Sequence, residues 1–82
     1  MDEAVVYQRL TQIFRDVFDD ESLVLSPNTT ASDIPGWDSL NHVNISVASE
    51  MAFAIRFNSS ELEELHNVGD LVKTIMRKRA DT

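Results

Sequence analysis

The stretch Ile34–Leu40, which reads IPGWDSL, joins a turn to the start of a helix. Pro35 and Gly36 end whatever structure precedes them, because proline blocks helix continuation and glycine adopts turn conformations easily. Asp38 and Ser39 form a pair of helix N-cap residues, since a short side-chain oxygen accepts a hydrogen bond from the unpaired N–H groups of a first helical turn. We therefore expect Ser39 where a loop becomes a helix, with its hydroxyl near solvent.

Upstream of this stretch, the sequence predicts a core-facing helix and then a long connection. Asp2 and Glu3 place acid at the helix start, and apolar residues recur at spacings of three and four up to Phe18. The polar run 19–22 lacks the alternating acids, central glycine and distal glutamate of a calcium loop, so we predict no metal site. Residues 23–34 form a long loop, which we expect to be pinned to the core by Leu23, Val24, Leu25 and Ile34.

The second helix, predicted from Ser39 to Phe53, has two apolar stripes. In a helical projection at 100° per residue, with Leu40 placed at 0°, the residues of one stripe lie within about 60° of Leu40. Those of the other lie between about 80° and 140° from it. One stripe suffices to cover a small core, so the second is either a contact surface or is buried by neighbouring helices. The first stripe contains Leu40, Val43, Val47 and Met51, and the second contains Ile45, Ala48 and Ala52.

Two further helices complete the chain, and no alternating run bounded by hairpin turns predicts a strand. Ser60 and Glu63, three residues apart, have the form of a capping box for a short third helix that ends near His66. Asn67 starts a fourth helix with an apolar stripe at helical spacing, and Phe57 and Leu65 should join the core. The predicted fold is an all-α four-helix bundle, with a short third helix and a long loop between the first and second helices.

Composition narrows the classes of function. We expect residues 1–82 to form one small domain, and no run approaches the roughly 18 apolar residues of a membrane span. The start lacks the features of a secretory signal, so we expect a cytoplasmic protein. Without cysteine, no disulfide or thiolate zinc site exists, and thiol chemistry requires an imported prosthetic group.

Charge is unevenly spread along the chain. Residues 1–70 carry 13 acidic and 3 basic side chains, and residues 71–82 carry 1 acidic and 4 basic, so −10 and +3 give the net charge of −7. The acidic body repels nucleic-acid phosphates and attracts basic protein surfaces, so we predict no nucleic-acid partner. We interpret the basic run Arg77–Arg79 as a complement to the dipole of the last helix, not as a membrane patch.

Gly36-Trp37-Asp38-Ser39-Leu40 resembles the attachment motif of acyl carrier proteins, in which the serine of Asp-Ser-Leu carries a phosphopantetheine arm. The context is also similar to that family. An apolar helix follows the motif, and then come Phe53-Ala54-Ile55, a short acidic segment and Val68-Gly69-Asp70-Leu71 at the start of the last helix. The resemblance covers nearly the whole chain.

The residues around Ser39 leave three interpretations. As a plain N-cap, Ser39 needs no function. As a hydrolase nucleophile it needs a base, but His42 on the same helix is poorly set to take its proton, and no Gly-x-Ser-x-Gly elbow is present. As an acceptor it needs only to be exposed and to fit another enzyme's active site. We expect no catalytic residues in this chain.

The resemblance implies that a phosphopantetheinyl transferase, with Mg²⁺, moves the arm from coenzyme A onto Ser39 Oγ, and that the arm then holds acyl groups as thioesters. The implied partners are acyl-loading and acyl-processing enzymes such as ketosynthases or acyltransferases. Asp38 would cap the helix and present the serine. Trp37 either flanks the arm or packs the loop onto the bundle. The resemblance makes Leu40, Val43 and Val47 partner-facing, with Trp37 as a further partner-binding residue. It assigns Ile45, Ala48, Ala52 and Phe53 to the core.

Several positions depart from the pattern of fatty acid synthesis carriers, which line the second helix with acids. In place of those acids this chain has Asn41, His42, Asn44 and Ser46. Partner docking through this helix should therefore be less electrostatic. Ala54 replaces a frequent glycine, Arg56 a common acid, and Ser49, at the core margin, a frequent leucine. The sequence of the motif resembles that of discrete carriers of polyketide or related specialised pathways more than that of housekeeping carriers. The alternatives are a housekeeping fatty acid carrier and an interaction module with Ser39 unmodified. We expect a monomer.

Overall fold

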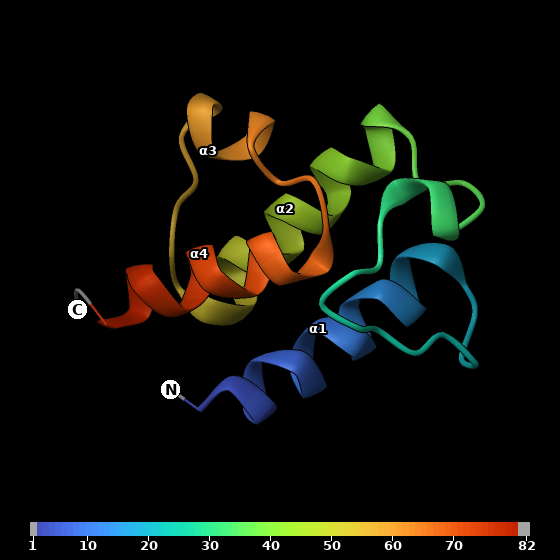
Figure 1. The fold of residues 1–82 in the computed structure, drawn as a ribbon, viewed down its shortest axis with the longest axis horizontal. Coiled ribbons are helices and arrows are strands. Elements are labelled where there is room, and N and C mark those ends of the chain that lie inside the picture. The colour runs from blue at the N-terminus through green and yellow to red at the C-terminus, as the bar shows by residue number, and fades with distance from the viewer. Residues whose placement is uncertain (1, 81–82) are drawn as a thin grey trace.

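The structure is a computed structural model that describes residues 2–80, and its described residues contain helices and no strand. The elements are α1 (Glu3–Phe18), a 3₁₀ helix η1 (Ala31–Asp33), α2 (Ser39–Phe53), α3 (Ser59–Glu63) and α4 (Val68–Ala80). α1 packs against both α2 and α4, and the start of α1 and the end of α4 lie at the same end of the molecule (Figure 1). The predicted four-helix architecture is confirmed. In the described part of the chain, no helix is both long and apolar enough to span a membrane.

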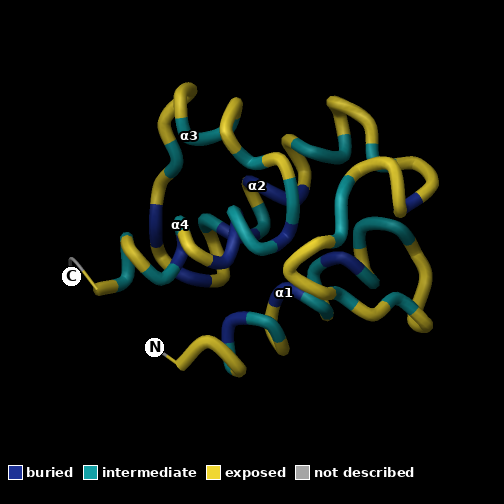
Figure 2. Tube along the Cα trace, in the orientation of Figure 1, coloured by how far each residue is buried: buried dark blue, intermediate teal, exposed yellow. Residues whose placement is uncertain are grey.

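The core forms where the apolar stripes of α1, α2 and α4 meet, and their buried positions turn inward (Figure 2). Each fully buried aliphatic or aromatic side chain stabilises the fold by about 1.5–3 kcal/mol, so this cluster is the main favourable contribution in so small a chain. Phe57 and Leu65, which were predicted to join the core, are half-buried and pack against its edge. The buried apolar residues are Val6, Leu10, Phe14, Ile34, Ile45, Phe53, Ile55, Val68, Leu71, Val72 and Ile75.

The long loop is fastened to the start of α4. The backbone N–H groups of Val68 and Gly69 donate to the carbonyl oxygens of Thr29 and Pro27, at 2.9 and 3.0 Å. These bonds satisfy two donors of the first turn of α4, which have no partner inside the helix. A Cβ at position 69 would lie 2.9 Å from the Pro27 oxygen, so the contact needs glycine.

The loop differs from the sequence-based expectation in two ways. Val24 is 79% exposed, so it does not pin the loop to the core, although Ile34 is buried and Leu23 and Leu25 are partly buried. The loop also contains η1, which was not predicted. Its short turn closes because the Thr30 N–H donates to the Asp33 carboxylate at 2.9 Å.

α2 spans the predicted residues, but its core face is rotated from the predicted one. Ala52 is exposed and Ala48 is only half-buried, so the assignment of Ala52 to the core is wrong. Ser49 is fully buried instead, and Ser46 is 4% exposed. Both hydroxyls donate to carbonyl oxygens one turn back, Ser49 to Ile45 and Ser46 to His42, each at 2.8 Å. These bonds satisfy the polar groups, and the side chains can therefore be buried.

The capping box of α3 lies two residues earlier in the sequence than predicted. The capping box joins Asn58 and Glu61, not Ser60 and Glu63, with backbone-to-side-chain bonds of 2.8 and 2.9 Å in the two directions. The helix ends at Glu63 and not near His66. A five-residue helix has almost no stability of its own, so its position depends on contacts with the rest of the bundle.

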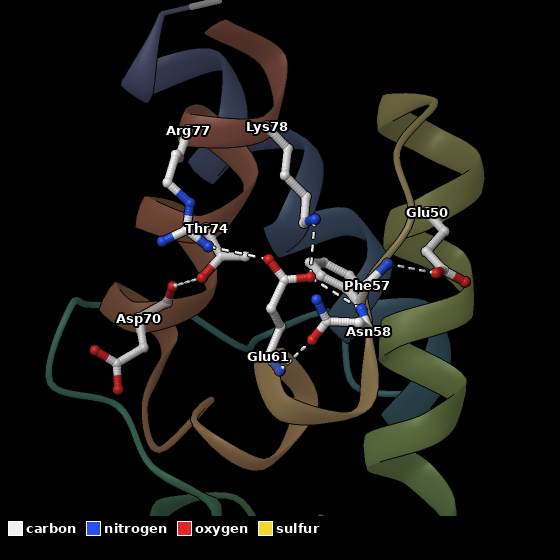
Figure 3. Close-up of polar contacts among 8 residues, drawn as sticks. All are labelled: Glu50, Phe57, Asn58, Glu61, Asp70, Thr74, Arg77 and Lys78. Carbon is white, nitrogen blue, oxygen red and sulfur yellow. Dashed lines mark hydrogen bonds and ion pairs between the residues drawn. The ribbon is translucent and has the colours of Figure 1, made fainter. Parts of the chain in front are cut away.

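Glu61 supplies one such contact (Figure 3). Its carboxylate accepts from Lys78 Nζ at 2.8 Å and from Arg77 Nη2 at 3.0 Å, and both residues lie in the last turns of α4. The hydrogen bond from Lys78, followed by that from the Asn58 N–H and the lysine charge, holds the pKa of Glu61 below its usual value. The basic run of α4 therefore binds α3 as well as complementing the dipole of its own helix.

Candidate functional site

The turn before α2 fixes Ser39 at the first helical position. Gly36 has a φ of +89°, which favours glycine, and its carbonyl oxygen accepts from Asn41 Nδ2 at 2.8 Å. Asp38 is the N-cap residue, because its Oδ1 accepts from the Asn41 N–H at 2.9 Å. Of the predicted cap pair, Asp38 alone makes the capping bond, and the interpretation of Ser39 as a plain cap is wrong.

Ser39 is exposed, and its hydroxyl makes no hydrogen bond to any residue in the described range 2–80. The first turn of a fifteen-residue helix carries unpaired N–H groups and the positive end of the helix dipole, both of which favour a phosphate group. A phosphate ester on Ser39 Oγ therefore fits this position without displacing an existing bond.

Trp37 and His42 are hydrogen-bonded to each other beside Ser39. The indole Nε1–H donates to His42 Nδ1 at 3.2 Å, and His42 Nε2 lies 3.3 Å from the carbonyl oxygen of Leu62 in α3. Because Nδ1 accepts, the ring proton is on Nε2, which donates to Leu62. Both ring nitrogens are thus engaged away from Ser39. The geometry gives His42 no role as a base for that hydroxyl.

The packing interpretation of Trp37 is confirmed. Its ring meets Phe14 edge-on with centroids 5.2 Å apart, contacts Phe18 at 6.4 Å, and stacks on His42 at 6.2 Å. Aromatic contacts of this kind contribute about 0.5–1.5 kcal/mol beyond the area they bury. Trp37 therefore fastens the loop before Ser39 to α1 on one side and to α2 on the other.

An open groove of about 540 Å³ runs beside Ser39 and is mainly apolar. Its lining brings together Ala31 of η1 with Leu62 and Glu63 of α3, and it also includes Trp37 and His42. The sequence did not indicate Ala31, Leu62 or Glu63, because they reach the groove through the packing of η1 and α3. The sequence could indicate only those lining residues of the groove that are close to Ser39 along the chain.

The predicted partner-facing residues of α2 all lie on the surface. Leu40 is 70% exposed, Val43 52% and Val47 47%, and Met51 extends the line at 80%. These four residues, spaced by three or four positions, form one face that leads away from Ser39 along the helix. We call them the α2 stripe. Trp37, predicted with them, is half-buried instead.

The site presents one exposed hydroxyl without a hydrogen bond at a helix start, and the described residues around it form no metal centre. In the described residues, no group of three or more His, Cys, Asp or Glu side chains is placed to hold a metal ion. Asp38 is the acidic group beside Ser39, and its Oδ1 is used by the cap bond. The arrangement can therefore present a hydroxyl at a helix start, next to an apolar groove and an apolar helix face.

Comparison with known proteins agrees with this geometry. The family described as phosphopantetheine attachment site matches residues 8–75. The solution NMR structure of the holo acyl carrier protein from Geobacter metallireducens is 48% identical, with a TM-score of 0.86 over 92% of this chain and 86% of that one. The search of curated proteins found no significant match. The match over residues 8–75, together with this likeness in sequence and fold, shows that the chain belongs to the acyl carrier protein family, whose prosthetic group is phosphopantetheine.

Proposed function

We propose that Ser39 is the residue through which this carrier bears its phosphopantetheine group. The observation that carries the proposal is the exposed, unbonded hydroxyl at the first position of α2. The other serines fit less well. Ser32 lies inside the three-residue 3₁₀ helix η1, and Ser60 is the second residue of the short helix α3, so neither begins a long helix. Ser46 and Ser49 are buried with their hydroxyls bonded, Ser22 donates to Asp20 at 2.6 Å, and Ser26 is bonded to Thr29. Ser59 also begins a helix, but that helix has only five residues and a correspondingly small dipole.

Each neighbour of Ser39 has a defined part in presenting it. Asp38 holds the loop onto the first turn of α2 and thereby fixes where the hydroxyl points. Trp37 and His42 link the loop to α2 and α3 at the groove. When bound, the prosthetic group supplies a thiol that holds an acyl group as a thioester. Tethering keeps the cargo at high effective concentration near each partner enzyme.

The protein's own contribution is presentation, not catalysis. Acyl carrier proteins are carriers, generally non-catalytic, and the two bonds of the His42 ring support the same role here. A transferase supplies the chemistry: Ser39 Oγ loses its proton and bonds the phosphorus of the phosphopantetheine group, while the pyrophosphate linkage of coenzyme A breaks and adenosine 3′,5′-bisphosphate leaves. We further propose that the chain acts as a monomer, because self-association would cover the α2 stripe.

The pathway we propose is polyketide or related specialised biosynthesis. The outer face of α2 presents neutral side chains such as Asn41, Asn44 and Met51 in place of acids. The carboxylate of Glu50, an acid of α2, accepts a hydrogen bond from the Phe57 N–H at 2.8 Å. Partner enzymes that recognise this helix must therefore do so mainly by apolar contact. Fatty acid synthesis enzymes that depend on a row of acids should accept this carrier poorly.

Intact mass tests the attachment site. The chain is incubated with coenzyme A, Mg²⁺ and a broad-specificity phosphopantetheinyl transferase, beside Ser39→Ala and Ser59→Ala variants. We expect one phosphopantetheine addition in the wild type and in Ser59→Ala, and none in Ser39→Ala. Ser59 is a matched control because it is an exposed serine at the first position of another helix. Addition to Ser39→Ala, or a folded wild-type protein that several transferases leave unmodified, would contradict the proposal.

The pathway is tested with the acylated protein as donor to two ketosynthases, one from fatty acid synthesis and one from a polyketide system. We expect faster acyl transfer to the second enzyme, with little dependence on salt. Faster, salt-sensitive transfer to the first would identify a housekeeping carrier instead. Sedimentation over a range of concentrations tests the monomer, which a stable dimer would overturn.

A further inference from the structure

A second groove lies at the opposite end of α2 from Ser39. Its volume is about 790 Å³, and its apolar lining includes Val47, Met51 and Ile55. Met51 follows Ser39 by twelve positions, which corresponds to about 18 Å along the helix. The proposed attachment of phosphopantetheine does not use this groove. We call it the Arg56 groove, after the cation described next.

The charged residues of the Arg56 groove are Glu50, Arg56 and Lys78, and two of them already have partners. The Glu50 carboxylate accepts from the Phe57 N–H at 2.8 Å, and Lys78 is paired with Glu61 at 2.8 Å (Figure 3). Arg56 is exposed, and among residues 2–80 its guanidinium has no hydrogen bond or ion pair. The hydrogen bond to Glu50 does not remove its negative charge, so the groove holds an acid beside its two cations. Of the three charged side chains, Arg56 is the one without a hydrogen bond or ion pair within residues 2–80.

Exposed apolar area accompanies this cation. Met51 is 80% exposed and Val47 47%, and both belong to the α2 stripe. A flexible methionine in contact with water suits a surface that adapts to a second apolar side chain. The combination is an apolar lining with one exposed, unpaired guanidinium, which is complementary to an apolar side chain next to an acid.

We propose that the Arg56 groove docks an amphipathic helix of a partner protein, which places an apolar side chain against Met51 and an aspartate or glutamate against Arg56. The proposal rests on the carrier function, because a carrier must be recognised by the enzymes that load and unload it. It reverses the polarity expected for a chain with a net charge of −7, for which basic partner surfaces would be the default. A second copy of this chain is a poorer occupant, because it would bring together two chains that each carry a net charge of −7.

The test uses a displayed library of short amphipathic helices whose polar positions vary freely, selected on the unmodified wild-type chain. We expect enriched sequences with an acid next to an apolar anchor. The best synthetic peptide should bind at least about fivefold more weakly to Arg56→Glu, which corresponds to the upper range measured for an exposed ion pair. Replacing the acid of the peptide by lysine should restore binding to that variant. Lys73→Glu is the matched control, an exposed charge reversal on α4 outside the groove, and should bind like the wild type.

The proposal is overturned by enriched peptides that are basic, by the absence of any enrichment, or by equal binding to Arg56→Glu and the wild type. A wild-type dimer that Arg56→Glu dissociates would assign the groove to a second copy of the chain. The binding measurement needs no modification of Ser39, and the mass measurement needs no peptide. Failure of the attachment site and failure of the Arg56 groove are therefore separate results.

Discussion

Replacing Glu61 by glutamine tests whether α3 is held in place by charge. The Glu61 side chain is 15% exposed and accepts from Lys78, which is 23% exposed, and from Arg77, which is 62% exposed. Ion pairs at exposed sites contribute about 0.2–1 kcal/mol each, and the Lys78 pair should lie at the upper end because both groups are largely covered. Glutamine keeps the size of the side chain and can still accept from the Asn58 N–H. We expect a loss of about 1–1.5 kcal/mol at pH 7.

The pH dependence separates this loss from a packing defect. Hydrogen bonds from Lys78 and the Asn58 N–H lower the pKa of Glu61 below the ordinary value of 4.5. The unfolded chain therefore takes up the proton first as the pH falls, so the contribution is fully present above about pH 4.5 and disappears as the pH drops through the folded value. The difference in stability between wild type and Glu61→Gln should narrow over that acidic range.

Urea unfolding of both proteins at a series of pH values, down to the lowest at which both stay folded, measures this difference. The corresponding loss in melting temperature at pH 7 is roughly 4–12 °C. Glu64→Gln is the control, because Glu64 is exposed on the same segment and its carboxylate makes no hydrogen bond within the described chain. A difference that is negligible at pH 7, or that stays constant as the pH falls below 4.5, would refute the reasoning.

Four further tests concern the cap, the ring tautomer and two backbone positions. Asp38→Ala removes the bond to the Asn41 N–H and should cost about 1 kcal/mol in urea unfolding, whereas Asp38→Asn should keep most of that stability. Nitrogen NMR of the His42 ring near neutral pH should show Nδ1 without a proton and Nε2 with one; the opposite tautomer would contradict the indole bond. Ala54→Gly should raise the free energy of unfolding by about 0.5–1 kcal/mol, because Ala54 has a φ of +55°, which is strained for alanine, and unchanged stability would argue against that strain. Gly69→Ala should lower the free energy of unfolding by about 1–3 kcal/mol despite the better helix propensity of alanine, because the new Cβ would lie 2.9 Å from a backbone oxygen of the loop, and a gain in urea unfolding would show that the loop can move.

The sequence predicted the four helices because their signals are local. A cap side chain bonds to a backbone group three residues away, and an apolar stripe repeats within one helix, so neither requires knowledge of the rest of the fold. The position of α2 was confirmed for this reason, with Asp38 as the cap at its start. The exposure of Leu40, Val43 and Val47 was confirmed too. The role of Ser39 itself stays a prediction until the mass of the modified chain is measured.

The errors come from ambiguity within short segments. Asn58, Ser59 and Ser60 are all good caps, and acids follow at several positions, so the sequence allowed more than one capping box. The structure uses the pair Asn58 and Glu61, because Glu61 then also reaches the basic end of α4. Ala52 and Ser49 were misplaced because a helical projection gives the direction of a side chain but not the element that covers it.

The sequence by itself determined the order of the helices, the turn that leads into α2 and the solvent-facing position of Ser39, since each depends on interactions between near neighbours along the chain. Only the tertiary structure decided what surrounds them. The walls of the groove beside Ser39, the bond from Trp37 through His42 to Leu62, and the unpaired cation of the Arg56 groove bring together residues from separate elements. Such contacts depend on how amphipathic helices pack around a shared core, and local patterns along the chain do not specify that packing.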